Sequence, residues 1–465
     1  MDGNKREKKI AAPFFTVLAL LTAAGFCLFL RPEVSGAEKR ELTHFPAFSA
    51  ESFLRGEYFE EIGLWFSDTF PGRESWLAAA GRMETLRGLT STRVSLSQLG
   101  GRTEEDDLDA LLSRSSPEPS PAPTEEPTPE PREEPTPEPT STPEPTPEPP
   151  GDPAESVSDW EGYGPEEERK LHGAALLIDG TVVTLMSFNQ NASDNHAALV
   201  NRFADLLAAD GIRFFDLPAP NSAGVLLSPE LLQQLRAADQ GKVLTYMFQR
   251  ENDNVIKVNA FNDLVAHNDE YLYFSSDYHW TALGAYYAYE AFCRSAGFMP
   301  VPLTEYGGVS MGEYVGPLFY TMGMDSSIRI DRVMAYIPPG NVTMDIRNDS
   351  NPRNGTWGPV VDKSREENNM KYLCFINGDN AVTTLTNHDL PDAPDCVVLK
   401  DSFANPFVIY LTQHYHNVYV LDYRHYRDSV ARFAREHGAA DVILCQDISV
   451  SQSLAAQTLL PRNLQ

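Results

Sequence analysis

The segment Ser275-Ser276-Asp277-Tyr278-His279-Trp280 is followed directly by Thr-Ala-Leu-Gly-Ala-Tyr-Tyr-Ala-Tyr-Glu. The aromatic run at 271–274 predicts a short buried strand before it, and apolar residues at helical spacing predict a helix after it that ends at Gly297. Asp277 and His279 therefore fall at a turn from a strand to a helix. Residues two apart in extended backbone project to the same side, so the carboxylate can orient the imidazole as in a nucleophilic triad. The alternative is a His–Asp pair that only caps the helix.

A second stretch supplies a hydroxyl group. Residues 396–399, Cys-Val-Val-Leu, predict an apolar strand, and residues 403–415 predict a helix. Ser402 lies on the elbow between them, where a hydroxyl is exposed and the helix N-terminus can support a developing oxyanion. An Asp-Ser pair before a helix is also ordinary N-capping chemistry. Taken together, Asp277, His279 and Ser402 supply the three parts of an acyl-transfer site at turns between strands and helices.

Both stretches resemble known sequence motifs. The segment Asp-Tyr-His-Trp-Thr-Ala-Leu-Gly-Ala-Tyr-Tyr from Asp277 resembles the signature of the DHHW proteins, with Tyr278 in place of the first histidine of that name. Lys-Asp-Ser-Phe-Ala-Asn at 400–405 resembles the serine block of the same family. DHHW proteins are related to the SGNH-hydrolase-like alginate O-acetylation proteins. The resemblance covers most of the chain outside a proline-rich stretch, and it keeps Asp277 and His279 while leaving no role for a second histidine.

The resemblance implies a fold, an activity and partners. The fold would be an SGNH-hydrolase-like three-layer α/β fold with a mainly parallel sheet and a circularly rearranged motif order, because ordinary SGNH hydrolases carry the serine first. The activity would be that of a serine O-acyltransferase or esterase, with Ser402 as nucleophile, His279 as general base and Asp277 as its orienting acid. A cell-envelope or extracellular glycan would be the acceptor and acetyl the acyl group. A membrane acyltransferase is a further partner that this relationship suggests, and no cofactor is implied.

Several residues are candidates for holding an oxyanion or a substrate. The backbone N–H of Phe403, with Asn405 or Asn380, would bind the oxyanion, although turn formation is an alternative role for each asparagine. Asn221 lies in a polar loop at the carboxyl end of a predicted strand, where ligands gather in parallel sheets. Trp280, like Trp357 and Tyr320, could stack on sugar rings. Such stacking is also what a second class of protein would use, a non-catalytic glycan-binding or scaffold protein of an envelope polysaccharide machinery.

From residue 171 onward, predicted strands alternate with predicted helices, which is typical of a parallel sheet covered on both faces. Residues 300–371 interrupt the alternation with glycines, asparagines and isolated aromatics, and we expect an insertion near the mouth of the site. The strands are predicted at 174–178, 182–188, 212–217, 255–260, 396–399, 418–422 and 442–445, and the helices at 195–209, 231–238, 261–266, 403–415 and 430–437.

The composition restricts the classes of partner. The formal net charge is −29, but 21 acidic and 2 basic residues lie between Glu104 and Glu168. The acidity therefore belongs mostly to one segment, and no basic stripe suggests a nucleic-acid partner. The five cysteines are scattered and show no CxxC spacing, so neither a metal site nor a disulfide is predicted.

The chain divides into four predicted regions. Residues 1–37 carry a basic flank and an uncharged apolar run at 10–30, which predict a cytoplasmic tail and one transmembrane anchor. The alternative is a signal peptide cleaved near Ala37, and either way the rest of the chain is extracytoplasmic. Residues 38–113 form an aromatic helical region, residues 114–155 a disordered acidic proline-rich spacer, and residues 156–465 the SGNH-hydrolase-like domain.

Overall fold

The computed structural model describes residues 162–347, 355–367 and 370–460, together with a few isolated positions among the first 112 residues. The predicted membrane anchor, most of the aromatic N-terminal region and the proline-rich spacer lie outside the described residues. Within the part of the chain that is described, no helix has both the length and the apolar character needed to cross a bilayer.

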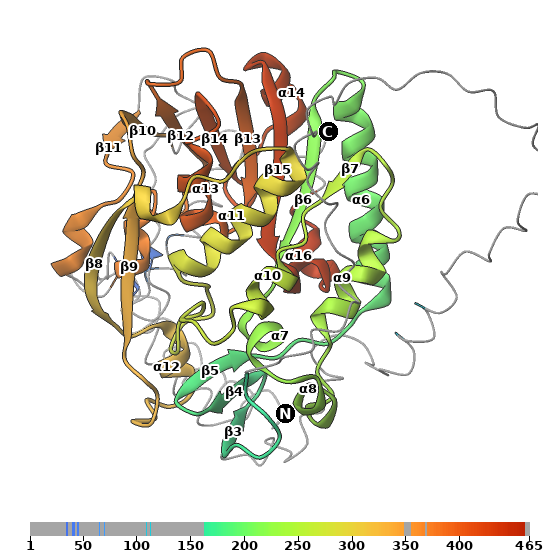
Figure 1. Ribbon diagram of the computed structural model, residues 1–465, viewed down its shortest axis with the longest axis vertical. Coiled ribbons are helices and arrows are strands. Elements are labelled where there is room, and N and C mark those ends of the chain that lie inside the picture. Colours follow the sequence, from blue (N-terminus) through green and yellow to red (C-terminus); the bar gives the residue numbers. More distant parts are fainter. Residues whose placement is uncertain are drawn as a thin grey trace, which may run out of the picture.

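An eight-stranded mixed sheet forms the centre of the molecule, with strand order β11-β10-β12-β14-β13-β15-β6-β7 (Figure 1). The strands from β14 to β7 pair in parallel, whereas β12, β10 and β11 extend the sheet by antiparallel pairing. The strands are β6 (Arg213–Ala219), β7 (Val255–Lys257), β10 (Val342–Arg347), β11 (Thr356–Gly358), β12 (Val382–Asn387), β13 (Asp395–Lys400), β14 (Asn417–Asp422) and β15 (Ala439–Asp447). The expected α/β fold with a mainly parallel sheet is confirmed.

The central strand β13 shows why its sequence suits the middle of such a sheet. Cys396 and Val398 pack into one hydrophobic cluster, whereas Val397 and Leu399 pack into the other on the opposite face. All four side chains are fully buried. A strand that is covered on both faces needs apolar residues at every position rather than at alternate ones, which is the pattern of Cys-Val-Val-Leu.

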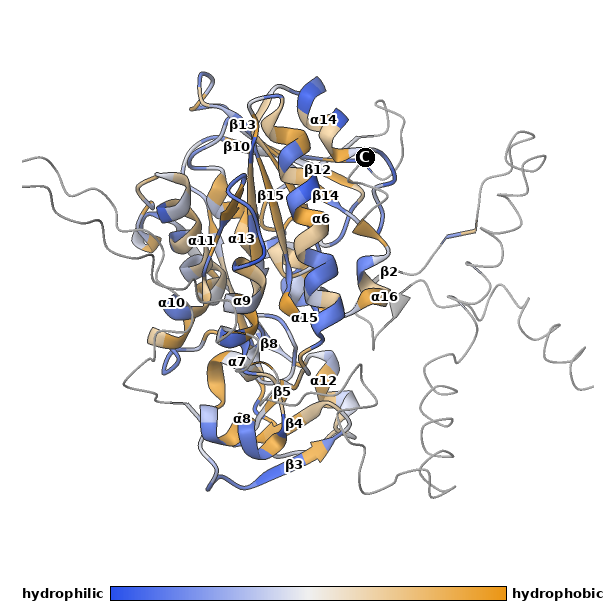
Figure 2. Cartoon of the chain, turned by 90° about the vertical axis from the view of Figure 1, so that its right-hand side faces the viewer, coloured by the Kyte–Doolittle hydropathy of each residue, from blue (hydrophilic) through white to orange (hydrophobic). Residues whose placement is uncertain are grey.

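Helices cover both faces of the sheet and complete three layers. Figure 2 shows α11 and α13 on one side of the sheet and α6 and α14 on the other. The helices are α6 (Gln190–Ala208), α7 (Ser222–Leu226), α8 (Pro229–Leu235), α9 (Gln240–Phe248), α10 (Phe261–Ala266), α11 (Ala282–Ala296), α12 (Pro317–Thr321), α13 (Ala404–Leu411), α14 (Val430–Glu436), α15 (Ile448–Ser451) and α16 (Leu454–Gln457).

Two smaller sheets flank the large one. The first consists of β3 (Arg169–His172), β4 (Ala175–Ile178) and β5 (Thr181–Thr184), and the second is the antiparallel pair β8 (Gly307–Tyr314) and β9 (Asp331–Ile337). Residues 300–371 thus contribute the separate β8–β9 pair and also β10 and β11, which extend the main sheet.

One predicted strand is wrong. Residues 271–274 form no strand of the sheet, and only Tyr273 makes an isolated antiparallel bridge, to Trp280. Leu272, Tyr273 and Phe274 are buried, so the aromatic run correctly indicated burial. An apolar run of four residues does not show whether its backbone pairs in a sheet.

This loop lies against the first turn of α11. Thr281 caps that helix by accepting the N–H of Gly284, and Gly297 ends it in the left-handed conformation. A Cβ added to Gly284 would lie 2.6 Å from the carbonyl oxygen of Leu272 and 3.1 Å from Cβ of Trp280. Glycine at this helical position therefore permits the close approach of the loop that carries Asp277 and His279.

We expect Gly284→Ala to lower the free energy of unfolding by about 1–3 kcal/mol, because the added methyl group meets backbone atoms. At an ordinary helical position the same change would raise the free energy of unfolding by up to about 1 kcal/mol. Urea denaturation measures the difference. Gly307→Ala is the control, since its nearest neighbour would lie at 3.6 Å, and equal stability of the two variants would contradict the close approach.

Candidate active site

Ser402 follows the carboxyl end of β13 and precedes α13, on the predicted elbow. The neighbouring Asp401 fixes this elbow: its carboxylate accepts the N–H of Phe403 at 2.9 Å and the N–H of Asp447 at 2.9 Å. The Ser402 hydroxyl is partly exposed. The turn thus presents the hydroxyl at the carboxyl edge of the parallel strands, where α/β folds place ligands.

Asp277 and His279 lie in the loop before α11, and a buried carboxylate holds this loop. Asp331, at the start of β9, accepts hydrogen bonds from the N–H of Ser275 at 2.5 Å, the N–H of Ser276 at 2.8 Å and the hydroxyl of Tyr271 at 2.5 Å. The Ser276 hydroxyl also donates to Asp331 and accepts the N–H of Gly316 at 2.7 Å. The N–H groups of Ser275 and Ser276 have no partner in a sheet, and the carboxylate of Asp331 accepts both.

The structure brings Asp277, His279 and Ser402 into one hydrogen-bonded line. Nδ1 of His279 lies 2.7 Å from Oδ1 of Asp277, and Nε2 lies 2.8 Å from Oγ of Ser402. His279 and Asp277 are 5% and 2% exposed. A neutral imidazole that donates from Nδ1 to the carboxylate leaves Nε2 free to accept the serine proton, which is the arrangement of an acid, a base and a nucleophile.

The environment of Asp277 keeps it ionised. Burial acts to raise the pKa of the Asp277 carboxyl, but the charge and hydrogen bonds of His279 and the hydroxyl of Tyr314 outweigh burial and leave the pKa below its usual value. The Tyr314 hydroxyl donates to Oδ2, the oxygen that does not bind the imidazole. Asp277 is therefore a charged acceptor at neutral pH and can stabilise an imidazolium.

Aromatic side chains enclose the imidazole. The ring of Tyr372 stacks on that of His279 with centroids 4.0 Å apart, and its hydroxyl donates to the carbonyl oxygen of Ser402 at 2.8 Å. The centroid of the Tyr278 ring lies 4.2 Å from that of the imidazole, and Tyr278 itself is exposed. Neither Tyr372 nor Tyr314 could be predicted from the sequence, because neither lies near the two motifs and a single tyrosine carries no spacing pattern.

A buried ionic cluster lies behind the serine turn. Nζ of Lys400 contacts Asp379 at 2.7 Å, Oδ1 of Asn405 at 2.8 Å and Asp422 at 3.0 Å. Arg424 contacts both aspartates, at 2.9 and 2.6 Å. Burial acts to raise the pKa of Asp379, but the charges of Lys400 and Arg424 hold it far below its usual value. The cluster fixes the carboxyl end of β13 just before Ser402.

The predicted oxyanion donors are mostly engaged elsewhere. The N–H of Phe403 donates to Asp401, and Asn405 is fully buried with its Nδ2 donating to Asp379 at 3.1 Å. Asn380 makes one 3.3 Å hydrogen bond from Nδ2 to the carbonyl of Asn377 and keeps a second amide hydrogen. The N–H of Ser402 makes no hydrogen bond to any described residue, which leaves it available to a developing oxyanion.

The other two predicted substrate contacts do not fit the structure. Trp280 is fully buried, and its indole N–H donates to the carbonyl of Phe403 at 2.7 Å, so it joins two loops of the protein instead of stacking on a sugar. Asn221 is buried as the N-cap of α7 and also bonds the side chain of Gln240. A strand-end position indicated proximity to the site, but Oδ1 of Asn221 is used for the cap and for the bond from Gln240.

Asp447 is a further acidic group at this edge of the sheet. Burial and the adjacent Asp401 raise the pKa of Asp447 to about 6, although its side chain is partly accessible. It caps α15 through the N–H of Ser449 at 2.9 Å. The charge of this group therefore changes close to neutral pH beside the serine turn.

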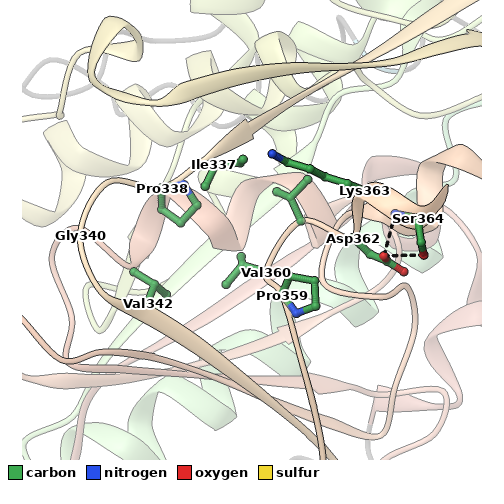
Figure 3. Close-up of a pocket in the computed structure, with 10 residues that line it drawn as sticks. Ile337, Pro338, Gly340, Val342, Pro359, Val360, Asp362, Lys363 and Ser364 are labelled. Carbon is green, nitrogen blue, oxygen red and sulfur yellow. Dashed lines mark hydrogen bonds between the residues drawn. The ribbon is translucent and has the colours of Figure 1, made fainter. Parts of the chain in front are cut away.

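One hollow lined by described residues lies away from this site. A cavity of about 450 Å³ lies between the end of β9 and the segment 359–364, and none of its lining residues belongs to the Ser402 site (Figure 3). Asp362 at its rim accepts hydrogen bonds from Ser364 (Figure 3). We assign it no role in the chemistry, because the groups that could react lie at the sheet edge instead.

A serine on a strand-to-helix elbow, joined through a histidine to a buried aspartate, defines a Ser-His-Asp site on a three-layer α/β fold. The family model described as DHHW protein matches residues 38–109 and 168–421. The chain therefore belongs to the DHHW family.

Solved structures with a similar fold include a DHHW family protein from Eubacterium siraeum, which is 22% identical over 64% of this chain and 98% of its own, with a TM-score of 0.56. Bacillus cereus PatB1 with a sulfonyl adduct is 16% identical over 63% of this chain and 98% of its own, with a TM-score of 0.49. The O-acetyltransferase domain of Pseudomonas putida AlgJ is 16% identical over 64% of this chain and 100% of its own, with a TM-score of 0.37. Comparison with curated proteins finds no match.

We expect Tyr314→Phe to destabilise the protein at pH 7 by about 1–3 kcal/mol, because it leaves one oxygen of a buried carboxylate without a donor. The depressed pKa of Asp277 contributes stability above the unfolded pKa, and this stability is lost as pH falls through the native pKa. Loss of Tyr314 raises the native pKa, so the destabilisation should shrink between pH 7 and pH 3. Urea denaturation at both pH values tests this.

The control for this experiment is Tyr287→Phe. The Tyr287 hydroxyl also donates to a carboxylate, that of Glu270 at 2.7 Å, but on the surface, so its loss should cost less than about 1 kcal/mol. A Tyr314→Phe penalty of the same size at pH 3 as at pH 7 would mean that the ionised Asp277 is not the group stabilised.

Proposed function

We propose that this protein is a serine O-acyltransferase or esterase that acts on a glycan of the cell envelope or of the extracellular space. The observation that carries the proposal is the line from Ser402 Oγ to His279 Nε2 at 2.8 Å and from His279 Nδ1 to Asp277 at 2.7 Å. A structural His–Asp pair that only caps a helix has no reason to place a partly exposed serine hydroxyl on its second nitrogen.

In the proposed reaction, His279 takes the proton of the Ser402 hydroxyl as Oγ attacks the carbonyl carbon of the acyl donor. The resulting imidazolium is stabilised by ionised Asp277, and the oxyanion accepts the N–H of Ser402 and an amide hydrogen of Asn380. His279 then gives its proton to the leaving group, which departs and leaves an acyl-enzyme. A hydroxyl group of the acceptor, or water, attacks this ester with His279 again as base, and Ser402 is regenerated.

The acyl group and the acceptor rest on the family relationship. The resemblance to alginate O-acetylation proteins supports acetyl as the acyl group and a polysaccharide hydroxyl as the acceptor. Transfer and hydrolysis use the same residues and differ only in which hydroxyl deacylates Ser402. A membrane acyltransferase that delivers the acyl donor is part of the proposal.

We expect Ser402→Ala and His279→Ala each to lower the turnover of a chromogenic acetate ester by about 10³-fold or more, while thermal melts change little. Triad members act as a unit, so the double variant should be barely slower than either single one. Asp277→Asn should reduce turnover less than Ser402→Ala. Ser310→Ala and His388→Ala, at exposed positions outside the site, are the controls.

Normal turnover by a well-folded Ser402→Ala variant would show that another group is the nucleophile. If the wild type neither hydrolyses nor transfers acetyl but binds polysaccharide, the protein is a glycan-binding or scaffold protein instead.

The location is also proposed. The basic flank and the apolar run at residues 10–30 support a single membrane anchor with the catalytic domain outside the cytoplasm. We expect a phosphatase reporter fused after the last residue to be active, because such reporters need an oxidising compartment. Recovery of the protein in the culture medium with its N-terminus near residue 38 would show that the segment is a cleaved signal peptide.

A further inference from the structure

A second group of reactive side chains lies inside the protein on the α6 face of the sheet. His196 comes from α6, Asp216 from β6 and Glu251 from the turn between α9 and β7 (Figure 1). One ligand atom from each lies within 4.8 Å of the ligand atoms of the other two. His196 and Asp216 are fully buried and Glu251 is 6% exposed. The residues are 20 and 35 positions apart, so no motif in the sequence marked them.

The polar atoms of this group are poorly satisfied. Nε2 of His196 bonds Oδ2 of Asp216 at 2.8 Å. The other carboxylate oxygen of Asp216, both oxygens of Glu251 and Nδ1 of His196 are buried without a partner among the described residues. Gln446 adds two more unpartnered atoms. It lies diagonally next to Asp216 on the same face, because Leu444 pairs with Asp216 in neighbouring strands. Unpartnered buried groups at this density indicate that something is bound between them.

Charge leads to the same conclusion. Two ionised carboxylates and one imidazole buried together carry a net negative charge even when the imidazole is protonated. Buried charges in proteins are paired or coordinate a metal ion. A single proton shared between the carboxylates would satisfy only two of the three free oxygens. A divalent cation neutralises both carboxylates and accepts several oxygens at once.

The geometry fits a small cation. Two tetrahedral ligands bonded at about 2.0–2.2 Å lie roughly 3.4 Å apart, so His196 Nε2 and Asp216 Oδ2, which are hydrogen-bonded at 2.8 Å, would need to move apart only slightly to hold the ion. The cation would take the place of the proton that these atoms share, and that proton would go to solvent. An imidazole with two carboxylates favours zinc over calcium, because calcium prefers oxygen ligands alone.

We propose that His196, Asp216 and Glu251 form a binding site for one zinc ion, which joins α6, β6 and the turn before β7. The site is distinct from the Ser402 site: Asp216 pairs within the sheet, with Leu444, whereas Ser402 follows the carboxyl end of β13. Its role is structural, because it connects three elements and faces the interior. Whether or not zinc binds at this site therefore does not decide whether the proposed acyl transfer is correct.

The test is a metal titration of the full-length protein after removal of metals with a chelator. Equilibrium dialysis should give one zinc ion per chain, and zinc should raise the melting temperature by roughly 5 °C or more at saturation. Titration in weak buffer should release about one proton per zinc ion. Calcium at the same concentration should have no such effect.

Glu251→Gln and His196→Gln are the informative variants, because each removes one ligand with little change of volume. Both should lose the stabilisation by zinc, and Glu251→Gln should melt at or above the metal-free wild type since it removes a buried charge. Asp345→Asn, a change at a buried carboxylate paired with Arg347 elsewhere, is the control and should keep the zinc response. Absence of zinc binding by the wild type, or an unchanged zinc response in Glu251→Gln, would overturn the proposal.

Discussion

The carboxylate of Asp331 is the interaction on which the proposed active site depends. A loop that is buried but unpaired in a sheet leaves backbone N–H groups without acceptors, and each such group costs about 1–3 kcal/mol. Asp331 accepts from two of these groups and from Tyr271. One carboxylate thus replaces the neighbouring strand that the loop lacks, and the loop can carry Asp277 and His279 in one fixed conformation.

Two further hydrogen bonds hold the serine turn, one from this loop and one from the segment 371–374. The indole N–H of Trp280 donates to the carbonyl of Phe403, and the hydroxyl of Tyr372 donates to the carbonyl of Ser402. Both acceptors belong to the turn itself, and both donors are buried aromatic residues next to His279. The separation of base and nucleophile is therefore set by rigid side chains instead of by the flexible chain between them, which is what preorganised chemistry requires.

The sequence predicted the parts of this arrangement that depend on local pattern. Apolar periodicity and turn residues predict the strand before Ser402, the turn that carries Ser402 and the helix after His279. The order of the motifs matches that of the family which the sequence resembles. Interactions between distant residues could not be predicted in this way. The aromatic run at 271–274 indicates burial whether or not it pairs, and nothing in the neighbourhood of Asp331, Tyr372 or Glu251 shows which residue each will meet. Trp280 and Asn221 are wrongly predicted as substrate contacts, because the sequence shows polarity and position but not which atoms are already bonded.

The strand order has a consequence for how the protein forms. Among the described residues β15 is the last strand along the chain, yet it lies between β13 and β6 inside the sheet. Until residues 439–447 are available, β6 and β7 share no backbone pairing with the strands from β11 to β13, and the two halves have open edges that can pair with other chains. A chain made from its N-terminus thus carries an incomplete sheet until residues 439–447 have been synthesised. The sheet becomes continuous only when β15 takes its place between β13 and β6.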